Sequence, residues 1–80
     1  MKSYCYNLGL SSEEIQKIRV GFYVQFEDVE VYEKNGSVYA AFLASSEKEI
    51  DRMIEEACGI ILFYYPKLSL EGTAFEEKPE

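Results

Sequence analysis

Residues 21–43 read GFYVQFEDVEVYEKNGSVYAAFL, and this stretch decides the fold. Asn35-Gly36 stands between two runs that are rich in β-branched and aromatic residues. Asn-Gly between such runs is the strongest short-range signal for a β-hairpin, because both turn residues tolerate a positive φ. A two-residue turn at this point places Tyr32 opposite Tyr39. The stretch therefore predicts an antiparallel hairpin.

The alternation of apolar residues in this stretch breaks once, near Glu27-Asp28. Apolar positions are even-numbered before the break and odd-numbered after it. One extra residue restores a single apolar face, so the pattern predicts a β-bulge there. The face expected to be buried carries Phe22, Val24, Phe26, Val29, Val31, Ala40 and Phe42. The opposite face carries Tyr23, Gln25, Glu30, Tyr32, Tyr39, Ala41 and Leu43.

A strand and a short helix are expected before this stretch. Residues 2–8 alternate between apolar and polar side chains, which is the period of a strand. Ser11 and Glu14 have the spacing of a capping box, and Leu10 with Ile15 has the spacing of a hydrophobic staple. We expect the helix to end at Gly21, where a left-handed residue is easily accommodated.

A second capping box, Ser46 with Glu49, predicts a longer helix. Apolar side chains then recur at helical spacing, namely Ile50, Met53, Ile54, Ala57, Cys58 and Ile61. Its end has two readings: Gly59 stops the helix and residues 60–65 form a buried strand, or the helix continues to about Tyr64. The second is favoured because Ile61, Tyr64 and Tyr65 stay on the same stripe, and only Ile60 and Phe63 point away from it. A final strand is expected over residues 68–75.

The resulting order is βαββαβ. It predicts a ferredoxin-like α+β sandwich, an antiparallel sheet with two helices packed on one face. Eighty residues with an apolar share of 48% suit one domain. We place this domain at residues 1–75 and expect a flexible acidic tail at residues 76–80.

The charge balance restricts the possible partners. Fifteen acidic residues oppose eight basic ones, for a net charge of −7. Such a chain repels phosphate backbones and anionic membranes, so direct nucleic-acid or membrane binding is disfavoured and a basic protein partner is favoured. The start of the chain has no apolar signal region, and the longest apolar run, residues 60–65, is far below the roughly 20 residues that span a bilayer. Cys5 and Cys58 are expected as reduced thiols, with a Cys5–Cys58 bridge as the alternative, and this predicts a cytoplasmic protein.

Catalytic motifs are missing from the sequence. The chain has no His, the usual general base and commonest metal ligand, and no phosphate-binding glycine motif. Four carboxylates cluster at Glu27, Asp28, Glu30 and Glu33, but on a strand they alternate between faces and do not converge. Cys58 is expected to pack in the core. We therefore expect no enzymatic activity, no cofactor and no metal.

The open face of the predicted sheet carries Tyr23, Tyr32 and Tyr39. In outline the aromatic open face resembles RRM domains, where sheet aromatics stack on bases, with Tyr6, Tyr32 and Tyr39 at roughly suitable places. Here Glu30 replaces the basic residues that such a surface needs. Tyrosine combines contact area with a hydroxyl group and is enriched in protein interfaces, so Tyr23, Glu30, Tyr32 and Tyr39 are candidates for binding a protein partner. The alternative is a face covered in part by the C-terminal segment, or simply exposed.

A row of carboxylates, Glu47, Asp51 and Glu55, recurs at four-residue spacing on the second helix. A solvated helix face explains this row, and so does imitation of a phosphate track that fills a basic groove. In size and charge the chain is similar to small acidic inhibitors of phages and mobile elements, anti-CRISPR proteins among them. The leading expectation is therefore an acidic module that binds another protein and inhibits or regulates it.

A second expectation keeps the ferredoxin-like fold but changes the role. The βαββαβ order is also similar to ACT-type regulatory domains, which form homodimers and bind small ligands at the dimer seam. By that resemblance, the ligand would lie near the first strand–helix turn, at residues 7–9. A homodimer is thus a second possible state of the chain.

Overall fold

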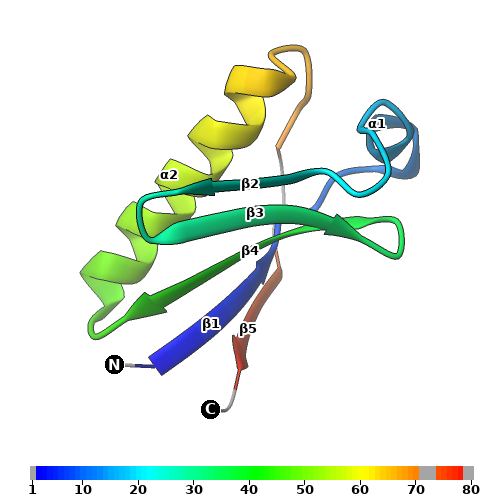
Figure 1. The fold of residues 1–80 in the computed structure, drawn as a ribbon. Coiled ribbons are helices and arrows are strands. Elements are labelled where there is room, and N and C mark those ends of the chain that lie inside the picture. Colours follow the sequence, from blue (N-terminus) through cyan, green and yellow to red (C-terminus); the bar gives the residue numbers. More distant parts are fainter. Residues whose placement is uncertain (1, 71–73, 79–80) are drawn as a thin grey trace.

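The computed structural model describes residues 2–70 and 74–78 and contains one antiparallel sheet with a long helix across it (Figure 1). Its elements are β1 (Lys2–Asn7), α1 (Ser12–Gln16), β2 (Tyr23–Phe26), β3 (Val29–Lys34), β4 (Ser37–Ala44), α2 (Glu47–Tyr64) and β5 (Ala74–Lys78). The strand order is β2-β3-β4-β1-β5, and every neighbouring pair is antiparallel. The predicted small α+β fold is confirmed.

The predicted β-bulge at Glu27-Asp28 is wrong. The chain reverses there in a two-residue turn, with Phe26 opposite Val29 and Glu27 at φ 53°. A two-residue turn and a one-residue bulge each move the apolar positions from even to odd residue numbers. Both therefore leave the same side chains on the same face. The sequence pattern could not separate them, and the predicted division into two faces holds although its cause was misread.

The ferredoxin-like order is not confirmed, because the extra turn adds a strand. The order along the chain is βαβββαβ, with β2, β3 and β4 as a meander. β4 and β5 both run antiparallel to β1 and enclose it, with α2 connecting them across one face of the sheet. The short α1 lies toward one end of the sheet (Figure 1). Only α2 has the length to cover the strands.

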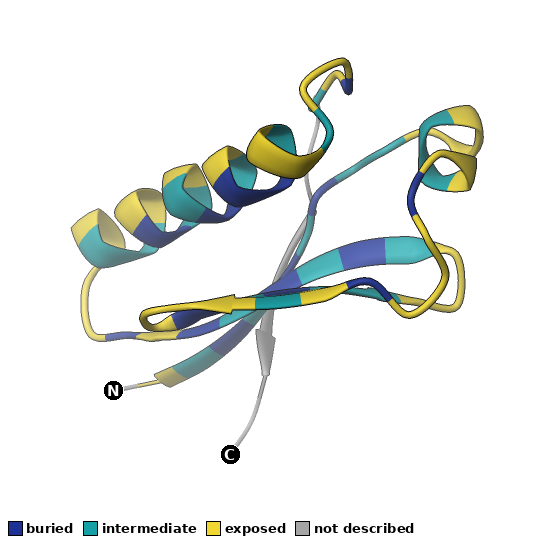
Figure 2. Ribbon diagram, turned by 45° about the horizontal axis from the view of Figure 1, so that its top comes forward, coloured by how far each residue is buried: buried dark blue, intermediate teal, exposed yellow. Residues whose placement is uncertain are grey.

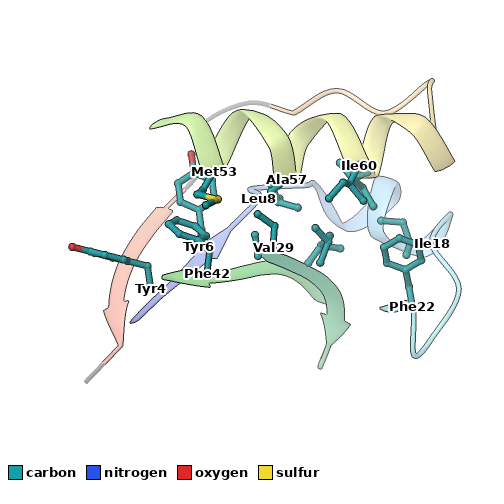
Figure 3. Close-up of a cluster of buried hydrophobic side chains, with 14 of the residues drawn as sticks. Tyr4, Tyr6, Leu8, Ile18, Phe22, Val29, Phe42, Met53, Ala57 and Ile60 are labelled. Atoms are coloured by element: carbon teal, nitrogen blue, oxygen red, sulfur yellow. The ribbon is translucent and has the colours of Figure 1, made fainter. Parts of the chain in front are cut away.

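The core lies between α2 and one face of β1, β3 and β4 (Figures 2 and 3). Its buried side chains are Tyr4, Tyr6, Leu8, Ile18, Phe22, Val29, Val31, Val38, Ala40, Phe42, Ala44, Met53, Ala57, Ile60, Ile61 and Leu68. In register, Val29, Phe42 and Tyr4 form one row across three strands. Each buried aliphatic side chain contributes about 1.5–3 kcal/mol relative to exposure. This packing orients the sheet with its second face away from α2.

Two members of the predicted buried face are not enclosed. Val24 is half-buried, and Phe26 remains 51% exposed. Both belong to β2, the edge strand, which makes no contact with α2 comparable to those of β3 and β4. Burial of a strand depends on whether another element packs against it as well as on the direction of its side chains.

Both predicted helix starts are confirmed. The Ser11 hydroxyl accepts the N–H of Glu14 (3.2 Å), and the Ser46 hydroxyl accepts that of Glu49 (3.3 Å). The long version of α2 is confirmed, since it continues through Gly59 to Tyr64. The predicted end of α1 at Gly21 is wrong, because the helix ends at Gln16 and a non-helical segment leads into β2.

The last strand begins later than predicted. Residues 68–70 are not a strand, although Leu68 is buried, and residues 71–73 lie outside the described part of the chain. β5 pairs with β1 over Ala74–Lys78 and includes residues expected in the acidic tail. Residues 79–80 also lie outside the described part, and the flexible tail at residues 76–80 stays a prediction.

Two carboxylates hold the connecting segments together. Glu33 accepts the backbone N–H groups of Gly21 and Gly36, both at 3.0 Å, and these bonds lower the pKa of its carboxyl. Glu14 accepts the backbone N–H of Ser69 at 2.6 Å. The residues before β2 and after α2 are thereby fixed to elements distant in sequence.

The turn at Glu27-Asp28 predicts that Glu27→Gly stabilises the fold. Glycine adopts φ 53° without the left-handed penalty of about 1–2 kcal/mol, offset in part by its freer unfolded state. We expect the free energy of unfolding in urea to rise by up to about 1 kcal/mol. In the control Gln25→Gly, within β2, it should fall by a similar amount. Equal destabilisation by both changes contradicts the turn.

Candidate functional site

The open face of the sheet carries three tyrosines in one row. Tyr23 lies opposite Tyr32 across β2 and β3, and Tyr32 lies opposite Tyr39 across β3 and β4. Tyr32 and Tyr39 are half-buried, and Tyr23 is 55% exposed. Val31, beside Tyr32, and Val38 and Ala40, on either side of Tyr39, belong to the other face and are fully buried. We call Tyr23, Glu30, Tyr32 and Tyr39 the tyrosine face.

Contacts within the row hold its rings in place. The ring centroids of Tyr32 and Tyr39 are 5.8 Å apart, and the planes are tilted by 33°. The Tyr32 hydroxyl lies 3.4 Å from the Sγ of Cys5 in a hydrogen bond. The Tyr23 hydroxyl donates to the Gln25 side chain at 3.4 Å. The tyrosine face is therefore an apolar surface edged by hydroxyl groups, and its rings are held by these contacts.

Glu30 supplies negative charge beside this row. It is half-buried and belongs to the open face in the register of β3 with β4. The pKa of Tyr23 is raised, first by desolvation and then by the charge of Glu30 and a hydrogen bond with it. The structure thus brings together the four residues predicted to bind a partner on the open face. The placement of Tyr6 beside them is wrong, because its side chain is buried in the core on the other face.

The remaining candidates, Glu47, Asp51 and Glu55, lie elsewhere. All three are exposed on α2, which packs against the other face of the sheet. Asp51 raises the pKa of Tyr6, after the larger effects of burial and of Cys58, so its carboxylate lies toward β1. Because the sheet separates this acidic row from the tyrosine face, one flat partner surface cannot contact both.

The two cysteines lie on opposite sides of the sheet. Cys5 is on the open face, whereas Cys58 is on α2 and packs against the core. Both are free and half-buried, as expected for reduced thiols. Desolvation, followed by the charge of Glu55, raises the pKa of Cys58, which favours the neutral thiol over the reactive thiolate.

The turn at residues 7–9 forms a hydrogen bond within its own segment and packs against the core. At the turn after β1, the Asn7 side-chain oxygen accepts the N–H of Gly9 at 2.8 Å, and Leu8 is fully buried. This turn had been expected to border a ligand. Within the described residues, no group of three or more Cys, Asp or Glu side chains is arranged to hold a metal ion.

Sequence reasoning missed a groove beside the edge strand. It has a volume of about 490 Å³ and is lined by Val24 and Phe26 of β2 and by Gly59, Ile60, Phe63 and Tyr64 of α2. Glu56 contributes a carboxylate to the lining. We call it the β2–α2 groove. Its signal in the sequence was Phe63, which departs from the apolar stripe of α2 and is 79% exposed. The same expectation for Ile60 is wrong, because Ile60 is buried in the core.

Comparisons with known proteins identify no relative. No protein-family model matches this chain, and no similar protein is found among the curated proteins or the solved structures. Neither of the described helices combines the length and apolarity required to cross a bilayer. Functional inference therefore rests on the surfaces themselves.

The environment of Tyr32 in the tyrosine face predicts that this tyrosine ionises at an unusually high pH. Partial burial, the hydrogen bond with Cys5 and the nearby charges of Cys5, Tyr39 and Glu30 raise the pKa of Tyr32 to about 12. Alkaline titration of tyrosinate absorbance should show a step near pH 12 that Tyr32→Phe removes. Cys5→Ala should move this step toward pH 10, because it removes the hydrogen bond. An unchanged step in Tyr32→Phe contradicts the assignment.

The same shift predicts the direction of alkaline destabilisation. The pKa of Tyr32 is higher in the folded protein than its unfolded value of about 10. Its contribution to stability is therefore complete below pH 10 and is lost as the pH rises toward 12. Urea unfolding between pH 9 and 12 should show a smaller loss of stability in Tyr32→Phe than in the wild type.

Proposed function

We propose that the protein is a small acidic module that binds another protein through the tyrosine face. The supporting observation is the row of Tyr23, Tyr32 and Tyr39 on the sheet face away from α2. Adjacent strands hold side chains directly opposite one another, with Cβ atoms about 4.5–5.5 Å apart, so the row is continuous. Tyrosine is enriched at energetic centres of interfaces because a large rigid ring is buried at low entropic cost.

The charge of the chain favours a basic partner surface. Glu30 lies within the tyrosine face, and the whole chain carries −7. Negative charge of this kind accelerates encounter with basic surfaces and opposes wrong partners of like charge. Stacking on nucleic-acid bases contributes about 1–3 kcal/mol per base, but an acidic surface lacks the phosphate contacts that dominate such binding. A protein with exposed Lys or Arg beside an apolar patch fits better.

The acidic row of α2 supports a second candidate surface. Glu47, Asp51 and Glu55 are exposed and repeat about every 6 Å along the helix. Such a line of carboxylates can occupy a basic groove in place of nucleic acid and thereby inhibit its owner. Solvation alone also explains these residues, so the row stands second to the tyrosine face.

The alternative role, a homodimeric ligand-binding module, has less support. It was expected to use the turn at residues 7–9, where the Asn7 side chain already bonds within its own turn. β1 is also an interior strand, paired on both sides. A ligand at that turn would have to compete with an existing local hydrogen bond.

Matched variants on the two surfaces test the proposal. The partner is captured from cells that make the protein and its affinity for the wild type measured. Tyr23→Ala combined with Tyr39→Ala should weaken binding about tenfold or more, as expected when interface tyrosines are truncated. The control replaces Glu47, Asp51 and Glu55 by Lys on α2 and should reduce binding less.

The reverse result overturns the proposal. If the α2 variant abolishes binding and the tyrosine variant retains it, the acidic row is the interface and the phosphate-mimic role replaces this one. Far-ultraviolet circular dichroism of each variant shows whether the fold is intact. Binding to single-stranded RNA that depends on Tyr23 and Tyr39 would also overturn a protein partner.

A further inference from the structure

The outer edge of β2 is open to another strand. β2 ends the sheet, and the Glu33 N–H donates to the Phe22 carbonyl at 2.9 Å. In an antiparallel ladder the bonded pairs alternate, so Phe22, Val24 and Phe26 direct their backbone groups toward β3. Tyr23 and Gln25 therefore direct their N–H and C=O groups outward. Such an edge is a template for a further strand.

Exposed apolar side chains gather along this edge. Val20 is 93% exposed, Phe63 79%, and Phe26 and Tyr64 51% each. These are four of the six most exposed large apolar side chains within residues 2–70. A second hollow of about 500 Å³, lined by residues 19–24 and Tyr64, shares Val24 and Tyr64 with the β2–α2 groove. An apolar strip along an unpaired strand indicates a surface that is covered in a complex.

We propose that this edge pairs with the same edge of a second copy of the chain. One symmetric antiparallel register joins the outward groups of Tyr23 to those of Gln25 in the other copy, with Val24 on the twofold axis. Both outward residues of each strand are then bonded, which gives four backbone hydrogen bonds. The two sheets become one continuous sheet, with both α2 helices on the same side.

The side chains are complementary in this register. Phe26 of one copy lies opposite Phe22 of the other, on the face that borders the groove. The Glu27-Asp28 turn reaches residues 19–21 of the other copy, where Arg19 is exposed. Each copy thus presents a carboxylate pair at one end of the strand and a cation at the other. Twofold symmetry brings these opposite charges together twice.

This arrangement goes beyond the proposed function: it uses the outward backbone groups of Tyr23 and Gln25, whereas the proposed function uses the side chains of the tyrosine face. Because the twofold axis is perpendicular to the sheet, the two tyrosine faces lie side by side on one surface. The dimer therefore doubles the area available to a partner without covering Tyr32 or Tyr39. Binding through the tyrosine face and self-association through β2 can fail independently of each other.

Sedimentation of the full chain over a concentration series tests the proposal. The monomer has a mass of 9.2 kDa, and the wild type should approach twice this value as concentration rises. Gln25→Pro should weaken dimerisation at least tenfold. It removes an outward N–H that forms no hydrogen bond with the described residues of the monomer, so an edge strand tolerates it. Circular dichroism and urea unfolding check that this variant folds.

A charge exchange provides a test without altering the strand. Arg19→Asp and Asp28→Arg should each weaken the dimer about tenfold, because like charges then meet at both ends. An equal mixture of the two variants should restore a dimer with one copy of each, since both ends are again opposite in charge. Lys48→Asp is the control for Arg19→Asp: it lowers the net charge by the same amount at an exposed position on α2 and should leave dimerisation unchanged.

Three results overturn the proposal. The first is a wild type that stays monomeric at millimolar concentration. The second is a dimer unaffected by Gln25→Pro and by both charge variants, which places the interface elsewhere. The third is a monomer whose binding of a different protein is lost in Gln25→Pro, which assigns the edge to a foreign strand.

Discussion

The tight reversal at Glu27-Asp28 is the constraint on which the other features depend. It turns what would be one long strand into β2 and β3, and so adds a strand to the meander. Because the turn has two residues, the apolar side chains on both arms stay on one face. The same register places Tyr23 beside Tyr32 on the other face. It also leaves β2 at the edge of the sheet, where none of the described strands lies beside its outward backbone groups.

Apolar side chains pack on one face of the sheet, whereas charged side chains lie at the surface. α2 covers β3 and β4 with small and branched side chains such as Ala57 and Ile61, both fully buried. The acidic residues stay at the surface, where Glu14 and Glu33 also accept backbone N–H groups from distant segments. Acidic charge thus stabilises connections in some places and faces solvent in others. A count of carboxylates does not distinguish these roles.

Local patterns in the sequence predicted those features that depend on local physics. The Asn35-Gly36 turn and the register from Val29 to Phe42 were predicted because turn geometry fixes strand pairing. The capping residues Ser11 and Ser46 were predicted because a side-chain oxygen three residues before a free N–H forms the same bond in any fold. The tyrosine face followed from the same alternation.

The amino-acid sequence by itself determined which residues share a face, where both helices begin and how acidic the surface is, since periodicity, capping and charge act over a few residues. Tertiary structure decided the strand order, the position of β5 and the exposure of Phe26 and Phe63. These features depend on which strand α2 covers. The change from even-numbered to odd-numbered apolar positions fits both a bulge and a turn, so the sequence pattern does not decide which strand that is. Only the folded arrangement shows that the tyrosine face and the acidic row of α2 lie on opposite sides, and that an apolar groove runs along the free edge of β2.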